Sequence, residues 1–218
     1  MSGQYEITNV VEAARVEEDV AAGDFGHEAW ARARPVELAR YWSGAAAPPE
    51  RRAEARLLWG AAGLVARFVC RQEEPLVVSE RPALDRKTIG LWDRDVCELF
   101  VAPDPAAPHR YFEFEAAPTG EWLDLAVTLS PRGRETDWHY RSGMTASARL
   151  EGHTLTVGLR VPWRAFGRQP APAERWRANL YRCVGRDPDR GYLTWQPTHT
   201  PEPGFHVPEK FGWLKFKA

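Results

Sequence analysis

RYFEFEAAPTGEWLDLAVTL, residues 110–129, has the clearest strand pattern in the chain. Its first half alternates strictly, with Phe112 and Phe114 on one face, because successive side chains of a strand point to opposite sides. After the turn signal PTG, a second run carries an apolar stripe that begins with Leu123 and Leu125. The stretch predicts a β-hairpin with at least one buried face.

The same alternation recurs on both sides of this hairpin. The further strand-like runs are ARLLWGAAGLVARFVCR (55–71), TASARLEG followed by TLTVGLRVP (145–162), WRANLYRCV (176–184) and the closing FGWLKFK (211–217). Pro-rich, mostly polar stretches separate these runs at the spacing of a β-sandwich. We therefore predict an all-β fold, an antiparallel β-sandwich of jelly-roll or immunoglobulin-like type. PWRAFG (162–167) is its one predicted helical turn.

The chain length suits one domain. At 218 residues it lies within the range of a single β-sandwich and is long enough to bury a core. No internal repeat and no shift of composition marks a second domain. We predict a single domain over residues 23–218. Residues 1–22 precede it either as an N-terminal extension or as a first strand leading into the sandwich.

Composition narrows the classes of partner. The net charge is −1 and both signs are spread along the chain, so we expect neither a nucleic-acid partner nor a membrane surface. Residues 1–20 are acidic and lack the apolar core of a signal peptide. The sequence as written predicts a cytoplasmic protein, or an extracellular one if a leader has been removed.

Most signatures of catalysis and metal binding are missing. No phosphate-binding loop, nucleophile elbow or zinc-binding helix motif occurs, and the six histidines are scattered. The three cysteines are too far apart to predict a disulfide framework or a zinc site: Cys70, Cys97 and Cys183. We expect no cofactor. Calcium stays an open alternative because Asp93, Asp95 and Asp104 offer oxygen atoms, although no regular loop supplies six or more ligands.

An acidic, Trp-led run is the most informative functional signal. LWDRDVCELFV (91–101) places Trp92 six residues before Glu98, and the neighbouring predicted strand carries Glu113 and Glu115 on one face. Aromatic rings stack on the apolar faces of sugars, and carboxylates accept bonds from their hydroxyl pairs. The pattern favours a sugar-binding cleft. A glycan-processing enzyme that uses these clustered glutamates is an alternative, since glycosidases work with paired carboxylates.

These segments, taken in order, resemble the family 9 carbohydrate-binding modules, within the wider DOMON-like group of β-sandwiches. The resemblance extends over residues 23–217, and four segments carry it: GDFGHEAWARARPVEL (23–38), ARLLWGAAGLVARFVC (55–70), LWDRDVCELFVAP (91–103) and LTWQP…GFHVPEKFGWLKF (193–216). It implies a non-catalytic domain that holds a sugar or another small ligand between two aromatic side chains. By position these are Trp92 and Phe205, with Glu98 as a hydrogen-bonding carboxylate.

The chain departs from the family pattern at four positions, one of which is Phe205, where the modules have a tryptophan. Where the modules have an arginine and an asparagine on the next strand, this chain has Glu113 and Glu115, and His206 replaces the loop arginine. Trp195 is either a core residue or a wall of the pocket. A second alternative function is haem b binding, as in related DOMON-like sandwiches, for which Met144 is the one internal methionine.

Overall fold

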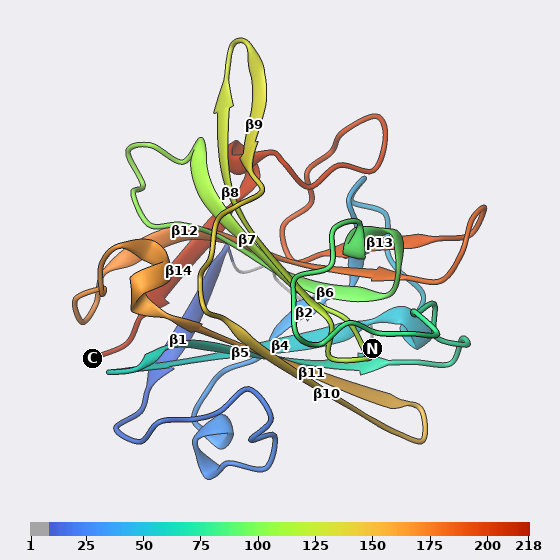
Figure 1. The fold of residues 1–218 in the computed structure, drawn as a ribbon, viewed down its shortest axis with the longest axis horizontal. Helices are drawn as coiled ribbons and strands as arrows, with labels where there is room; N and C mark the ends of the chain where they lie inside the picture. The colour runs from blue at the N-terminus through green and yellow to red at the C-terminus, as the bar shows by residue number, and fades with distance from the viewer. Residues whose placement is uncertain (1–8) are drawn as a thin grey trace, which may run out of the picture.

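The computed structural model describes residues 9–218, in which the chain forms a mixed sheet of 14 strands and five short 3-10 turns (Figure 1). The all-β prediction is confirmed. Residues 1–8, the first part of the segment in which no signal peptide is recognised, lie outside the described residues. No helix within residues 9–218 has the length and apolar character needed to cross a membrane.

The sheet folds over itself into two layers. In the first layer the strand order is β10-β11-β5-β4, with β2 beside β4. Its members are β2 (Val36–Leu38), β4 (Ala53–Gly60), β5 (Gly63–Arg71), β10 (Thr145–Glu151) and β11 (Thr154–Pro162). All of these pairs are antiparallel, and β4–β5 and β10–β11 are the two hairpins that the sequence predicts here.

The second layer runs in the order β14-β12-β6-β7-β8-β9. A short strand, β13, also pairs with β12, and β3 pairs with β13. Its members are β3 (Arg40–Tyr41), β6 (Val96–Ala102), β7 (Arg110–Ala116), β8 (Trp122–Ser130), β9 (Gly133–Asp137), β12 (Arg175–Val184), β13 (Gly191–Thr194) and β14 (Gly212–Phe216). In Figure 1 the β8–β9 hairpin projects upward, away from the first layer.

One strand joins the layers and changes the character of the sheet. β1 (Val10–Arg15) lies between β4 and β14 and is parallel to both. The sheet is therefore mixed and not antiparallel throughout, which corrects that part of the prediction. Parallel neighbours need a long connection, and β1 obtains its two partners from distant parts of the chain. Local alternation could not show this pairing.

The main core fills the space between the two layers. Leu64, Ala66 and Phe68 of β5 point into it, as the alternation predicts, and Phe114 and Trp176 reach it from the second layer. The ring of Trp176 is fully buried. It lies 4.8–6.1 Å from the rings of Phe216, Phe166 and Trp163, two of which come from the 3-10 turn η4 (Trp163–Phe166). That turn is the predicted helical turn.

The outer face of the second layer is also buried. A separate cluster there contains Phe100 of β6, Tyr111 of β7 and Tyr181 of β12, covered by Phe205 and Phe211. The remaining 3-10 turns are η1 (Glu28–Ala31), η2 (Pro49–Arg51), η3 (Leu91–Asp93) and η5 (Pro208–Lys210). Because both faces of β6 are covered, all seven of its residues are buried, including a glutamate. The candidate site lies on this second buried face.

Candidate ligand-binding site

A cavity of about 400 Å³ opens on the outer face of the second layer. Glu98 and Phe100 of β6, Glu113 of β7 and Cys183 of β12 contribute to its lining from the strands. Around them stand four aromatic side chains: Trp92, Trp138, Tyr192 and Phe205. The volume falls within the roughly 300–1,000 Å³ of small-ligand pockets, and aromatic walls with a few placed polar groups are their usual chemistry.

Trp92 stands at the side of this cavity because a short turn holds it there. Gly90, in the left-handed conformation (φ 81°), precedes η3. Trp92 belongs to this turn and not to β6. Arg190 donates hydrogen bonds of 2.7–3.0 Å to the carbonyl oxygens of Trp92, Asp93 and Arg94. The backbone of the turn is thereby fixed while the ring remains 36% exposed. A fixed backbone and an open ring face suit stacking on a ligand.

Trp138 forms the second exposed aromatic wall. It follows β9, is 43% exposed, and its ring centroid lies 6.2 Å from that of Trp92, with an interplanar angle of 47°. The β8–β9 hairpin also brings Arg134 and Thr136 to the cavity. The segment RETDWHY reads as a polar loop, and its sequence contains no signal that places it beside a strand 40 residues away. Sequence reasoning missed these three residues.

Phe205 is an aromatic wall of another kind. Its ring lies parallel to that of Tyr181, with centroids 4.0 Å apart and an interplanar angle of 10°, and the edge of Tyr192 packs against it. Only 9% of Phe205 is exposed. One face of the ring is therefore already occupied within the protein. Phe205 offers the cavity a smaller aromatic surface than either exposed tryptophan.

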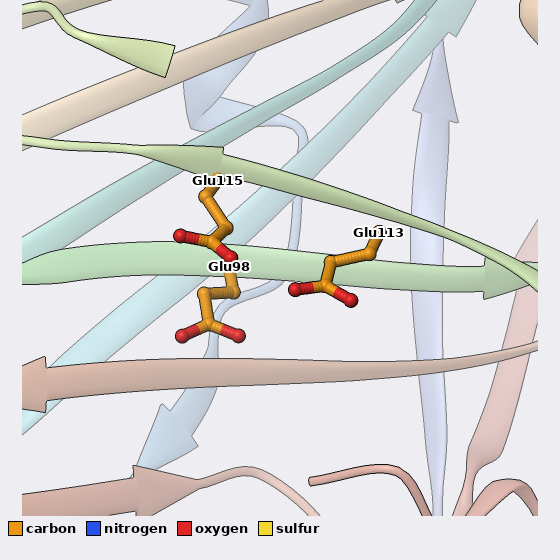
Figure 2. A group of neighbouring side chains, drawn as sticks. All are labelled: Glu98, Glu113 and Glu115. Carbon is orange, nitrogen blue, oxygen red and sulfur yellow. The ribbon is translucent and has the colours of Figure 1, made fainter. Parts of the chain in front are cut away.

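Three buried carboxyl groups converge beside these aromatics. Glu98 and Glu115 are direct cross-strand partners in β6 and β7, and Glu113 lies two residues from Glu115 on the same face. One carboxylate oxygen from each lies within 4.8 Å of the other two. Figure 2 shows the three side chains together. The three residues are 2%, 3% and 0% exposed for Glu98, Glu113 and Glu115. Within residues 9–218 this is the one group of three or more potential metal-ligating residues so closely placed.

Burial raises the pKa of all three carboxyl groups. The pKa values of Glu98 and Glu115 lie well above the usual range, first because of burial and second because neighbouring carboxylates repel each other's charge. The pKa of Glu113 is also raised, chiefly by burial. Among the described residues, no Lys or Arg forms an ion pair with any of the three.

His206 adds no positive charge to the group. Its Nδ1 lies 2.7 Å from the hydroxyl oxygen of Tyr111, and its Nε2 lies 4.0 Å from Oε2 of Glu113. Burial lowers the pKa of His206 to about 3. The imidazole is therefore neutral near pH 7, and the cluster stays uncompensated from this side.

This electrostatic arrangement predicts an effect of Glu115→Gln on stability. A carboxyl whose pKa is raised on folding stabilises the fold fully below its unfolded pKa of about 4.3, and this stabilisation is lost as the pH rises through the folded pKa. Glutamine does not ionise, so the variant does not lose this stability as the pH rises. Its amide can also donate a hydrogen bond to Glu113. We expect the variant to be about 1–2 kcal/mol more stable than the natural chain near pH 8 and to match it near pH 4.

Melting curves of both proteins across this pH range measure the effect, at roughly 2–4 °C for each kcal/mol. Glu135→Gln is the control. Glu135 lies exposed on β9, so this substitution removes a carboxyl group outside the cluster. A Glu115→Gln variant that is destabilised at every pH would contradict the interpretation.

Most of the residues that the sequence proposes for the site do reach this cavity. Trp92, Glu98, Glu113, Phe205 and His206 line it. Glu115 is fully buried and is not among the lining residues, although it contacts the carboxylates that are. The three carboxyls therefore share one buried face of the layer instead of a solvated outer face.

Trp195 is the exception among the proposed site residues. It is buried in the main core between the layers and does not line the cavity. Its ring packs so closely on Gly212 of β14 that a Cβ there would lie 2.4 Å from Cη2. The side chain points to the opposite face from the cavity, which corrects the pocket-wall alternative in favour of the core alternative.

The aspartates considered for calcium do not gather at one point. Asp95 is buried and accepts a 2.8 Å hydrogen bond from the amide of Gly185. Asp104 accepts one of 2.9 Å from the amide of Ala106 in its own exposed loop. Asp93 lines the ligand cavity. Each thus has a separate local environment, and they do not form a common ligand set among the described residues.

One family model matches more than half of the chain. The model of carbohydrate-binding family 9 matches residues 77–216. A candidate carbohydrate-binding protein from Bacteroides uniformis is 18% identical over 95% of this chain and 99% of its own, with a TM-score of 0.69. A search of curated proteins finds no match.

Two further solved structures are similar over almost the whole chain. Both are family 9 carbohydrate-binding modules from Caldicellulosiruptor kristjanssonii at 11% identity. The complex with glucose has a TM-score of 0.66 and covers 96% of each chain. The complex with cellotriose has a TM-score of 0.68 and covers 96% of this chain and 94% of the other. At these identities the likeness shows the fold.

Proposed function

This chain belongs to carbohydrate-binding family 9, and on that premise we propose that it binds a sugar, without altering it chemically, in the cavity lined by Trp92, Trp138 and Phe205. The observation that carries the proposal is the pair of exposed tryptophans beside buried carboxylates in one cavity. A pyranose presents an apolar C–H face to the rings and a rim of hydroxyl donors to the carboxylates. The solved relatives with glucose and cellotriose support this class of ligand.

The placement of the carboxylates favours binding over hydrolysis. A glycosidase needs one carboxyl on each side of the scissile bond, about 5–5.5 Å or 6.5–9.5 Å apart. Here Glu98, Glu113 and Glu115 extend from the same face of two adjacent strands, with oxygens within 4.8 Å of one another. They would all meet one side of a sugar. We expect no release of chromophore from chromogenic glycosides, and a turnover that disappears in Glu113→Gln would contradict this.

The haem alternative has no support at the cavity. Met144, the proposed iron ligand, is buried in the main core between the layers. Its side chain lies on the other side of the second layer from the cavity lining. The sugar-binding proposal is therefore the one that the arrangement of side chains supports.

Isothermal titration of the natural chain with glucose and with cellotriose tests the proposal directly. We expect heat of binding for at least one of them, and competition between the two if both bind. A broad glycan array extends the test to other sugars. An array without any bound glycan, together with no heat from either sugar, would contradict the proposal.

Trp138 provides a prediction that the sequence alone did not suggest. Trp138→Ala is expected to weaken sugar binding about 5- to 10-fold, since stacking on an aromatic ring contributes on the order of 1 kcal/mol. The exposed ring contacts mainly Trp92, so the melting temperature should change little. Trp213→Ala is the matched control, because Trp213 is half-buried on β14 beneath Arg177 and away from the cavity. Equal effects of the two substitutions on affinity would contradict the placement of Trp138.

A further inference from the structure

The cavity is lined by more carboxyl groups than basic groups. Asp93, Glu98 and Glu113 line it, and Arg134, on an exposed hairpin, is the one lysine or arginine among its lining residues. The charge of nearby Arg190 acts to lower the pKa of Glu98, but burial and Glu113 still raise it. The guanidinium of Arg190 bonds to four backbone carbonyl oxygens and packs over the ring of Tyr192. His206 is neutral near pH 7 because burial lowers its pKa. Burial raises the pKa of Glu98 and Glu113, and a bound cation would favour the ionised form of both. The lining therefore suits a positively charged occupant.

The carboxyl group cluster also lacks hydrogen-bond donors. Among the described residues, Oε2 of Glu113 and both carboxyl oxygens of Glu115 are buried without a hydrogen-bond partner. Glu113 is 3% exposed and lines the cavity, so an occupant meets the edge of its carboxyl group there, while Oε2 itself is covered. Unsatisfied buried acceptors are costly. A ligand with hydrogen-bond donors and a positive charge would both bond to these acceptors and compensate the charge of the carboxylates.

The aromatic walls point to an organic cation and not to a metal ion. Trp92, Trp138, Tyr192 and Phe205 surround the carboxylates, and aromatic faces attract ammonium groups through their quadrupole. A calcium ion takes six to eight oxygen ligands, and aromatic rings supply none of them. An ammonium group offers three hydrogen-bond donors and one charge, which match closely spaced carboxylates.

We propose that the preferred ligand is a sugar that carries a protonated amine, whose ammonium group binds between Glu98 and Glu113 while its ring stacks on Trp92. This inference rests on the proposed sugar-binding function and specifies the class of sugar. Glu115, beneath the other two, completes the negative site without touching the sugar ring. Arg134, which lies on the exposed β8–β9 hairpin, repels the cation and so weakens its binding.

Three trisaccharides with the same backbone test the inference by titration calorimetry: the trimer of glucosamine, its fully N-acetylated form, and cellotriose. They differ in a charged amine, a neutral amide or a hydroxyl at one ring position. In a buffer in which the amines are protonated, we expect the glucosamine trimer to bind about tenfold more tightly than either neutral sugar. Raised salt should reduce this preference, because the added attraction is between charges.

Two variants and a control locate the preference. Glu113→Gln should reduce the affinity ratio of the amine to cellotriose to about twofold or less, and Arg134→Gln should increase the ratio. Glu135→Gln removes the same charge from the exposed β9, outside the cavity lining, and should leave the ratio unchanged. A melting curve of each variant shows that the fold is intact. The comparison of the three sugars on the natural chain stands without the variants.

The possible outcomes separate the inference from the function on which it rests. Equal affinity for the three sugars, or preference for a neutral one, would overturn the amine inference and leave the sugar-binding proposal standing. No binding to any of the three, with an empty glycan array, would overturn both. Heat from calcium or manganese chloride alone, removed by Glu113→Gln, would show that the cluster holds a metal ion and would overturn the amine inference.

Discussion

A Trp92→Ala variant is expected to lose sugar affinity about 30-fold while its stability falls by less than about 1 kcal/mol. The ring is 36% exposed and lines the cavity, so its free face is available for stacking. Covering that face and stacking on it contribute on the order of 2 kcal/mol together. The backbone of the turn should persist, because Arg190 bonds to its carbonyl oxygens and not to the indole ring.

Trp176→Ala is the contrasting variant. Trp176 is fully buried among Trp163, Phe166 and Phe216, and truncation of such a residue costs about 3–5 kcal/mol. Its melting temperature should fall by roughly 10 °C, whereas that of Trp92→Ala should fall by only a few degrees. Titration calorimetry and melting curves measure both. If Trp92→Ala melts as early as Trp176→Ala, Trp92 supports the fold and is not a stacking surface.

Glu98→Gln should weaken sugar binding by about 1.5–3 kcal/mol, or roughly 10- to 150-fold, while the fold remains intact. The substitution keeps shape and size but removes the carboxylate form of the side chain. Hydroxyl donors of a bound sugar would favour that form and bond to it as a charged acceptor. No lysine or arginine of residues 9–218 forms an ion pair with Glu98, and only the thiol of Cys183 bonds to it, at 3.5 Å. Glu98→Gln therefore leaves no lysine or arginine without its ion-pair partner.

The effect on stability distinguishes this role from a structural one. Because burial and the neighbouring Glu113 raise the pKa of Glu98, its ionised form is disfavoured in the folded state. Glutamine should preserve or increase the melting temperature at neutral pH. Asp124→Asn is the comparison, because Asp124 is fully buried and pairs with Lys87 at 2.6 Å, so its loss should destabilise the fold. A Glu98→Gln variant that loses stability and retains its affinity would contradict the binding role.

The longer strands with clear alternation, and their faces, could be predicted from the sequence. The period of two places Val96, Glu98 and Phe100 on one face of β6, and the structure finds Val96 and Phe100 in the outer cluster and Leu99 in the core between the layers. Likewise, Glu113 and Glu115 share a face because they are two residues apart on one strand. A local rule suffices wherever the answer depends on residues next to one another in the chain.

The sequence could not predict that Trp195 points into the core, nor that Trp138 lines the cavity. Trp195 comes directly after β13 (Gly191–Thr194), and its direction depends on Gly212 of a distant strand. Trp138 follows β9 and reaches the cavity together with Arg134 and Thr136 of the β8–β9 hairpin. Neither contact can be read from the local sequence pattern, since each joins segments that are far apart in the chain.

By itself, then, the sequence determined an all-β chain, the faces of its strands and the gathering of Trp92 with three glutamates. The tertiary structure alone decided that the glutamate face is buried and that β1 joins the two layers in parallel. The physical reason is that alternation reports which side chains share a face, whereas burial and charge compensation depend on what covers that face. Here the covering residues, among them Phe205 and Phe211, come from a loop about 90 residues beyond β7 and bring the carboxylates no cation.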